Sequence, residues 1–244
     1  MFSVFIVMKI DVRNLSIGYG NSIIQSSLNF TISDGELVAI LGANGCGKST
    51  LLRTLAGLQP ALGGSYSPEA DEKTSALVLT ERLSVESTTV HDVVAMGRYP
   101  YTSFLGTLTE HDERIVSDAM EQVGVGQMAD TYYNAHSDGE KQRVLIAKAL
   151  AQQTPIILLD EPTAHLDLPG RVQTLRLLSE LTRTQGKTIL ISTHELDLAM
   201  RYADRILLMM SQKGAMIETP ENLCGTTILN EAFGMDVLSL LGKK

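Results

Sequence analysis

The sequence has few cysteines and no excess of positive charge. Its 244 residues include two cysteines, Cys46 and Cys224, which are too few for a disulfide framework and fit a reducing compartment. Lysine and arginine number 20 against 28 aspartates and glutamates, so the formal net charge is −8 at pH 7. A protein whose whole surface binds nucleic acid is basic, so we expect no nucleic-acid partner, although local phosphate sites are compatible with this charge.

Long apolar runs, repeats and low-complexity segments are also missing. No apolar stretch reaches the roughly 18 residues that a helix needs to cross a bilayer. Residues 1–7 are apolar, but they lack the basic start and the small-residue cleavage site of a signal peptide. Because Met8 follows them directly, we interpret residues 1–7 as a tail or as an artefact of an upstream start.

The spacing of apolar residues predicts strands that alternate with helices. Residues 10–15 and 28–32 alternate apolar and polar side chains, which is typical of half-buried strands and predicts an antiparallel sheet near the N-terminus. Short, fully apolar runs are typical of strands that are covered on both faces. Such runs are found at Leu37–Leu41, 76–79, 156–159 and Thr188–Ser192. Helical patterns cover 48–58, 113–123, 140–153 and 171–184.

This order of elements predicts an α/β fold in which a mostly parallel sheet carries helices on both faces. Residues 84–151 are mostly helical and separate two of the core strands, so we interpret them as an inserted helical subdomain. A late hairpin is predicted at Arg205–Met210 and 215–218. The expected division is one domain over 8–244, with a core at about 8–83 and 152–220, the helical subdomain, and a C-terminal extension at about 221–244.

A glycine-rich turn follows the strand predicted at Leu37–Leu41. It fits the pattern G-x-x-x-x-G-K-[ST] and precedes Thr50 and a predicted helix. Its residues are Gly42, Ala43, Asn44, Gly45, Cys46, Gly47, Lys48 and Ser49. Glycine allows backbone N–H groups to point inward at a phosphate, and the helix adds its positive N-terminus. The pattern predicts that Lys48 contacts the β- and γ-phosphates and that Ser49 places its hydroxyl on Mg²⁺.

Two alternatives apply to this turn. A glycine-rich turn can bind no ligand, but the strand before it and the helix after it favour a phosphate loop. Cys46 could be a redox group, but a small side chain within the loop is the simpler interpretation.

Two carboxylates stand at the end of the apolar run 156–159. Ligands of open α/β sheets bind outside the carboxyl ends of the strands. We therefore expect Asp160 to hold Mg²⁺ through water and Glu161 to polarise a water that attacks the γ-phosphate. The alternative is an acid pair at the start of a helix, which the neighbouring phosphate loop disfavours. A nucleotide switch needs only the first acid, so the second indicates turnover.

Three further segments accompany the phosphate loop and the two acids. They are Pro162-Thr163-Ala164-His165-Leu166-Asp167, Ser192-Thr193-His194-Glu195 and Ser137-Asp138-Gly139-Glu140-Lys141-Gln142-Arg143. With them, about residues 9–221 resemble the ATP-binding-cassette (ABC) ATPase family, in which such segments are the D-loop, the switch-histidine segment and the signature motif. The resemblance implies a P-loop NTPase (RecA-like) core, an N-terminal antiparallel β subdomain and an inserted helical subdomain. It also implies hydrolysis of ATP with Mg²⁺.

The resemblance further implies roles for single residues. Tyr19 lies where the family stacks an aromatic ring on adenine; a core or hairpin tyrosine is the alternative. His194 would contact the γ-phosphate and hold the attacking water, although a lone histidine is more often structural. Asp167 would lie at the seam between two subunits. Ser137 and Gly139 would bind the γ-phosphate held by the facing subunit.

Within the signature motif the chain departs from the family. His136 and Asp138 replace the usual leucine and first glycine, whereas Ser137 and Gly139 are retained. Ser137 and Glu140 also have the spacing of a capping box, and we expect the serine both to cap its own helix and to meet a phosphate. We expect the side chain of Asp138 to turn away from the nucleotide, because a carboxylate there would repel it.

A second departure concerns the metal. The family places a glutamine near Mg²⁺ after the strand predicted at 76–79, and here Leu79-Thr80-Glu81-Arg82 stands in its place. We expect Glu81 to reach the metal with a full charge, and a solvated loop acid is the alternative.

One segment points to a transport role. Residues 90–101 resemble the part of ATPases of iron–siderophore, haem and cobalamin importers that receives a permease helix; an ordinary tyrosine–proline turn is the alternative. The resemblance then implies an ATP-hydrolysing subunit that forms a homodimer around two ATP molecules. It would act with a polytopic permease, and indirectly with a substrate-binding protein, at the cytoplasmic face of the inner membrane. A soluble ABC ATPase of DNA repair, translation or iron–sulfur assembly is the alternative function.

Overall fold

Two β-sheets of different kinds organise the chain in the computed structural model, which describes residues 10–68, 73–79, 87–103, 106–210, 214–224 and 226–233. The smaller sheet is antiparallel, with the order β2-β1-β4. It consists of β1 (Ile10–Tyr19), β2 (Ser22–Ile32) and β4 (Gly63–Ser67). Its register pairs Ile10 with Ile32 and Val12 with Phe30, so the apolar residues of β1 and β2 share one face.

The larger sheet has the order β5-β6-β7-β3-β8-β9. Its strands are β3 (Leu37–Leu41), β5 (Ser75–Val78), β6 (Ile156–Asp160), β7 (Thr188–Ser192), β8 (Arg205–Met210) and β9 (Gly214–Glu218). All of its pairings are parallel except the one between β8 and the edge strand β9. Every residue of β3, β6 and β7 is buried, as expected for strands covered on both faces.

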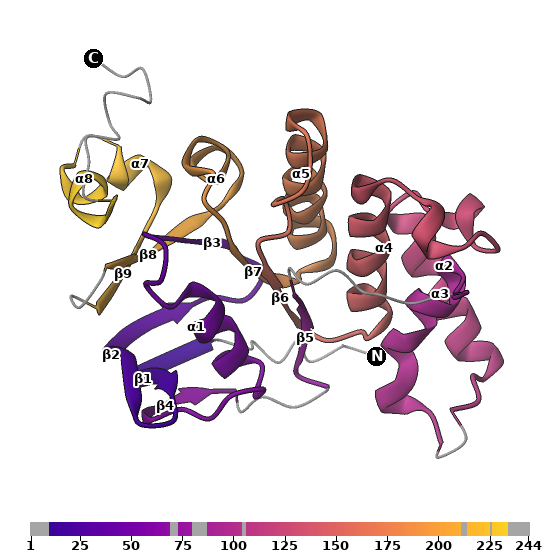
Figure 1. Cartoon of the computed structure of the whole chain (residues 1–244), viewed down its shortest axis with the longest axis horizontal. Coiled ribbons are helices and arrows are strands. Elements are labelled where there is room, and N and C mark those ends of the chain that lie inside the picture. The colour runs from indigo at the N-terminus through magenta and orange to yellow at the C-terminus, as the bar shows by residue number, and fades with distance from the viewer. Residues whose placement is uncertain are drawn as a thin grey trace, which may run out of the picture.

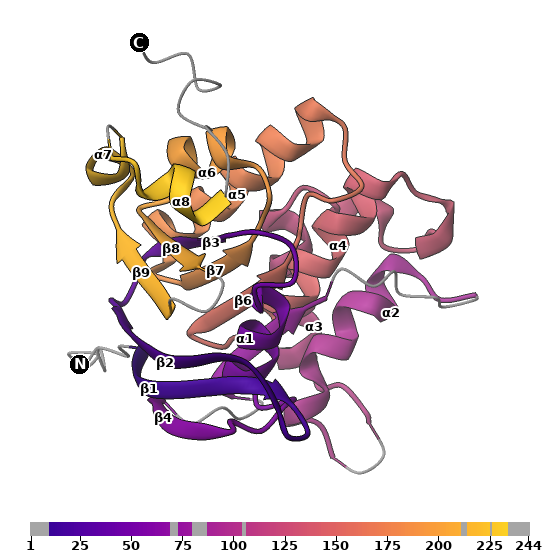
Figure 2. The same ribbon diagram turned by 60° about the vertical axis from the view of Figure 1, so that its left-hand side comes forward.

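The helices lie on both faces of this sheet and beyond one of its edges. The longer ones are α1 (Lys48–Leu55), α3 (Glu110–Gln122), α4 (Asp138–Ala151) and α5 (Leu168–Gln185). The short ones are α2 (Val90–Ala95), α6 (Leu196–Tyr202), α7 (Pro220–Leu223) and α8 (Ile228–Phe233), with 3-10 turns η1 (Met96–Tyr101), η2 (Gly126–Met128) and η3 (Tyr133–Ala135). Figures 1 and 2 show α2, α3 and α4 gathered at one end of the molecule, away from β1, β2 and β4.

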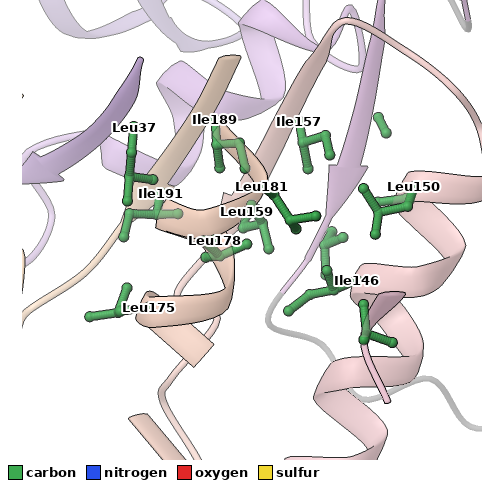
Figure 3. Close-up of a cluster of buried hydrophobic side chains, with 14 of the residues drawn as sticks. Leu37, Ile146, Leu150, Ile157, Leu159, Leu175, Leu178, Leu181, Ile189 and Ile191 are labelled. Carbon is green, nitrogen blue, oxygen red and sulfur yellow. The ribbon is translucent and has the colours of Figure 1, made fainter. Parts of the chain in front are cut away.

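Buried side chains form a layer on each face of the larger sheet. Alternate strand residues point to opposite faces, which fixes which neighbours they meet. On one face Val38, Ile40 and Leu158 pack with Leu51 and Leu52 of α1 and with the small sheet. The opposite face packs against α4 and α5 (Figure 3). Its residues include Leu37, Ile157, Leu159, Ile189 and Ile191, with Ile146, Leu150, Leu175, Leu178 and Leu181 from the helices.

Most predicted elements are confirmed, with shifted ends. The helix predicted to reach residue 58 ends at Leu55, because Gly57 takes a left-handed φ of 73° that stops the helix. The helix predicted from residue 140 starts at Asp138, where Ser137 caps it as expected. The late hairpin is present, and its turn at 211–213 lies outside the described residues. The strand β4 was not predicted, because its sequence Gly-Gly-Ser-Tyr-Ser has no apolar alternation. The domain bounds given above stay predictions.

Candidate functional site

The carboxyl ends of three neighbouring strands meet at one edge of the larger sheet. The register pairs Ser192 of β7 with Ile40 of β3 on one side and with Asp160 of β6 on the other. The segments that follow these strands therefore begin side by side. They contain the loop Gly42–Ser49, Glu161 and His194, so the fold brings together three groups that are far apart in the sequence.

The loop Gly42–Ser49 leads directly into α1. Gly42 and Gly47 have φ values of 152° and 101°, which favour glycine. A Cβ on Gly42 would lie 2.4 Å from the carbonyl oxygen of Met209 on β8, so a side chain does not fit there. Gly47 is the N-cap of α1, and no side chain caps this helix. Its first N–H groups are thus available to an anion, which the positive helix terminus also favours.

Lys48 folds back over the loop. Its side chain is buried at 6% exposure, and Nζ donates to the carbonyl oxygens of Gly42 at 3.0 Å and Ala43 at 3.3 Å. The ammonium group is thereby held against the loop that is predicted to bind phosphate. Cys46 is also buried, and burial raises the pKa of its thiol, which disfavours the reactive thiolate. This supports the interpretation of Cys46 as a small loop side chain.

Asp160 joins the loop to the neighbouring strands through hydroxyl groups. The Ser49 Oγ donates to Asp160 Oδ1 at 2.9 Å, and the Ser192 Oγ donates to the same oxygen at 2.6 Å. Ser192 Oγ in turn accepts a hydrogen bond from the Glu161 N–H at 2.9 Å. A hydroxyl and a carboxylate oxygen at this spacing are the hard oxygen donors that Mg²⁺ prefers, usually together with substrate phosphates. The residues present therefore fit the predicted metal.

Glu161 and His194 form a close pair beside Asp160. The His194 Nε2 lies 2.6 Å from Glu161 Oε1, and the two side chains are 42% and 30% exposed, respectively. Glu161 has a left-handed φ of 47°, which is uncommon for a residue with a side chain and often marks functional sites. Because a carboxylate only accepts, the His194 Nε2 carries the hydrogen of this bond, which leaves the second carboxylate oxygen for another donor.

Tyr19 lies at the end of β1. Its ring is 52% exposed, and its hydroxyl accepts a hydrogen bond from Thr50 Oγ1 at 3.4 Å. Thr50 is the third residue of α1, so the exposed ring stands next to the loop, where a planar base could stack on it. Glu81, the predicted extra metal ligand, lies outside the described residues.

The signature residues Ser137 and Gly139 lie at a second location. No hydrogen bond or ion pair in the described part of the chain joins them to the loop Gly42–Ser49. Ser137 caps α4, and Asp167 caps α5 by accepting from the Gly170 N–H at 3.0 Å. Between these helix starts lies an open cavity of about 630 Å³, lined by residues that include Ser137, Gly139 and Asp167. A single copy thus carries two separated groups of predicted site residues.

Some contacts of the site were missed from the sequence. Gln25 of β2 is buried, and its Nε2 donates to the carbonyl oxygens of Cys46 at 3.1 Å and Met210 at 2.9 Å, which ties the loop to two strands. Nothing in the local pattern of β2 indicates this role. Ser192 had a signal, because it is a polar residue at the carboxyl end of an apolar run.

Glu195 is a further missed residue. Its Oε1 accepts from Thr163 Oγ1 at 3.1 Å and pairs with Arg171 Nη1 at 3.2 Å. Arg171 Nε also donates to the carbonyl oxygen of Leu166 at 2.7 Å. The segment after His194 is therefore linked to the segment that precedes Asp167.

Comparison with known proteins identifies the family. Residues 25–164 match the family model described as ABC transporter. The chain belongs to the ABC transporter family. It is 37% identical to the petrobactin import ATP-binding protein FpuD of Bacillus anthracis, over 93% of this chain and 87% of the relative. It is 35% identical to the iron(3+)-hydroxamate import ATP-binding protein FhuC of Bacillus subtilis, over 93% and 88%.

A solved structure agrees with this assignment. An ABC transporter assigned to the metal-chelate type, in an inward-facing conformation, matches with a TM-score of 0.85 and 30% identity, over 93% of this chain and 89% of that one. The ABC ATPase fold predicted from the sequence is confirmed, with its P-loop core, antiparallel β subdomain and inserted helices. The chain is an ATP-binding and ATP-hydrolysing ABC importer subunit. In the described residues no helix is long and apolar enough to cross a membrane.

Proposed function

We propose that this ABC ATPase hydrolyses ATP at the loop Gly42–Ser49, with Glu161 and His194 acting on the attacking water. The observation that carries this proposal is the 2.6 Å contact between His194 Nε2 and Glu161 Oε1 at the carboxyl end of β6. The contact fixes one carboxylate oxygen and leaves the other to accept a hydrogen bond from water. The water is then oriented for in-line attack on the γ-phosphate, and His194 supports it from the side.

The remaining groups neutralise charge or bind the adenine, and they do not react with the nucleotide. Lys48 exchanges its hydrogen bonds to the carbonyl oxygens of the loop for bonds to the β- and γ-phosphates. Ser49 and Asp160 would hold Mg²⁺, which supplies positive charge to the phosphates when it is bound. Tyr19 offers its exposed ring to the adenine. Positioning and electrostatic stabilisation then provide most of the rate enhancement.

The active unit is a pair of copies that face each other. The separation of Ser137, Gly139 and Asp167 from the loop Gly42–Ser49 supports this arrangement, because these three residues line a cavity that contains no residue of the loop. In the homodimer, the cavity between α4 and α5 of one copy receives the nucleotide and loop of the other. Leu168, which is 64% exposed next to Asp167, gives this surface an apolar group to bury.

The cargo of the transporter is an iron–siderophore or a related chelate, with haem and cobalamin as the neighbouring possibilities. The names of the relatives FpuD and FhuC and of the matching transporter support this class. The segment 90–101 docks a helix of a polytopic permease, which holds the ATPase at the cytoplasmic face of the membrane. A substrate-binding protein delivers the cargo to that permease, and the ATPase itself does not touch it.

The substitution Glu161→Gln tests the proposal. The variant is expected to bind ATP but to hydrolyse it at least about a hundredfold more slowly, because the water loses its orienting carboxylate. It should also accumulate as an ATP-bound dimer in size-exclusion chromatography. Glu180→Gln is the matched control, since the Glu180 side chain is exposed on α5 and forms an ion pair with Arg176. Hydrolysis by Glu161→Gln at the wild-type rate would remove Glu161 from this role.

A further inference from the structure

His136 occupies the place of the leucine that the signature motif usually carries, and its side chain is only 14% exposed. Its two ring nitrogens have different neighbours. Nε2 lies 2.7 Å from Thr131 Oγ1, and Nδ1 lies 3.6 Å from Glu140 Oε2. The ring therefore bridges the segment before the signature motif and the first turn of α4.

The hydrogen bonds of Thr131 determine which nitrogen of His136 carries a hydrogen. The Thr131 hydroxyl has one hydrogen, and it donates this hydrogen to the carbonyl oxygen of Met128 at 2.6 Å. Thr131 Oγ1 must then accept from His136 Nε2. In the neutral ring the lone pair of Nδ1 consequently points towards the Glu140 carboxylate. In the protonated ring, Nδ1 becomes a donor to that carboxylate.

The same carboxylate oxygen also holds the signature serine. Glu140 Oε2 accepts from the Ser137 N–H at 2.9 Å and from the Ser137 hydroxyl at 2.7 Å. These two bonds from Ser137 lower the pKa of Glu140, so the carboxylate stays ionised as an acceptor. The hydrogen of the Ser137 hydroxyl is therefore engaged within its own subunit. This hydrogen bond to Glu140 has to break before the Ser137 hydroxyl can donate to a phosphate.

The charge of His136 changes the strength of this internal bond. A neutral ring turns a lone pair towards Glu140 Oε2 and leaves Ser137 as the donor to that oxygen. A protonated ring competes with Ser137 for Glu140 Oε2 and adds a positive charge one residue from the serine. Both effects make it easier for the Ser137 hydroxyl to turn towards a negatively charged phosphate.

We propose that His136 is a positioning residue, which controls through Glu140 whether the Ser137 hydroxyl is free to bind the γ-phosphate held by a facing copy. The inference rests on the proposed function, which assigns that contact to Ser137. The other charged residues close to His136 in the sequence are Asp130, Asp138 and Arg143, and His165 and Asp167 line the cavity beside Ser137 and Glu140. In the described residues, Glu140 is the only carboxylate within ion-pair distance of His136.

The test measures ATP-driven dimerisation of Glu161→Gln by sedimentation velocity at pH 6 and pH 8. Histidine changes its charge in this interval. The dimer is expected to be about fivefold or more tighter at pH 6, at the lower end of typical coupling between sites. In the double variants that add His136→Leu or His136→Gln, the ratio of dimer affinities at pH 6 and pH 8 should fall. It should then equal the ratio that protonation of ATP itself produces. Glutamine keeps a donor for Thr131 without titrating, so it separates charge from packing.

The control is His111→Leu in the same Glu161→Gln background, because His111 is an exposed histidine on α3. Its double variant should keep the full pH ratio. If the ratio of dimer affinities at pH 6 and pH 8 is unchanged in both His136 variants, another group causes it and the inference is overturned. Tighter dimerisation at pH 8 than at pH 6 would also overturn it. Failure of Glu161→Gln to dimerise with ATP at either pH instead overturns the proposed function, and the inference with it.

Discussion

At the scale of single residues, Lys48 is the only charged side chain within the loop Gly42–Ser49. Substitution of Lys48 by Ala should weaken ATP binding by about ten- to a hundredfold, since a hydrogen bond to a charged group contributes about 1.5–3 kcal/mol. Isothermal titration calorimetry measures this loss. Arg13→Ala is the control, because it removes an exposed cation from β1 whose one ion pair within the described residues is with Asp11. ATP affinity at the wild-type level in Lys48→Ala would place the nucleotide elsewhere.

The sequence predicts which residues form the site, but it does not predict which of their side chains are in contact. Lys48, Asp160 and Glu161 could be assigned because the loop pattern and the acids at a strand end are local signals. The contact between Glu161 and His194 could not, because it depends on the register of β6 and β7 and on the left-handed backbone of Glu161. Distances between segments that are more than 30 residues apart are properties of the fold rather than of any motif.

At the scale of elements, one buried ion pair joins three helix ends. Arg98 of η1 donates from Nε to Asp112 Oδ1 at 2.9 Å and from Nη1 to the carbonyl oxygen of Ala151, the last residue of α4, at 2.8 Å. Asp112 also closes a capping box with Thr109 at the start of α3. Both side chains of the pair are almost completely buried. The pair therefore ties η1, which lies within the predicted permease-docking segment 90–101, to α3 and α4.

The substitution Asp112→Asn tests how much this junction stabilises the fold. The bonds from Thr109, with Arg98 as a smaller cause, lower the pKa of Asp112 to about 2. Its stabilisation is therefore complete above the unfolded value near 4 and is lost as the pH falls towards 2. At pH 7 the variant should lose about 3 kcal/mol of unfolding free energy in urea, because Arg98 keeps a buried charge without its partner. This difference should shrink between pH 4 and pH 2.

The control for this experiment is Asp118→Asn, an exposed acid on the same helix. It should leave the unfolding free energy within about 0.5 kcal/mol of the wild type. Equal stability of Asp112→Asn and Asp118→Asn at pH 7 would mean that the buried pair contributes nothing.

The bounds of the strands and helices show which structural features the sequence patterns predict and which they miss. The buried strands β3 and β7 were predicted with their observed bounds, because they combine an apolar run with flanking polar residues. The start of α3 was predicted three residues late, although Thr109-x-x-Asp112 is a capping-box signal in the sequence. β4 exists only because its backbone pairs with β1, and such pairing leaves no trace in a run of small and polar residues.

At the scale of the whole molecule, electrostatic repulsion opposes the pairing of two copies around ATP. The formal net charge of −8 means that two copies repel each other, and ATP adds further negative charge to their junction. Asp138 lines the same cavity as Ser137 and Gly139, so this residue lies beside the surface where a phosphate would arrive. Since it lies in the first turn of α4, it also stabilises its own helix dipole by about 0.3–1 kcal/mol.

The substitutions Asp138→Asn and Asp138→Gly test whether the Asp138 carboxylate repels the nucleotide of the facing copy. At about 6 Å, a pair of like unit charges costs roughly 0.7 kcal/mol in water and about 3 kcal/mol at an effective dielectric constant of 20. If the carboxylate turns away from the nucleotide, ATPase activity should stay within a few-fold of the wild type. ATP-driven dimerisation should then become somewhat tighter, mainly at low salt, where screening is weakest. A loss of activity beyond about tenfold, with an unchanged circular dichroism spectrum, would instead show that the Asp138 carboxylate has a positive role at the junction of the two copies.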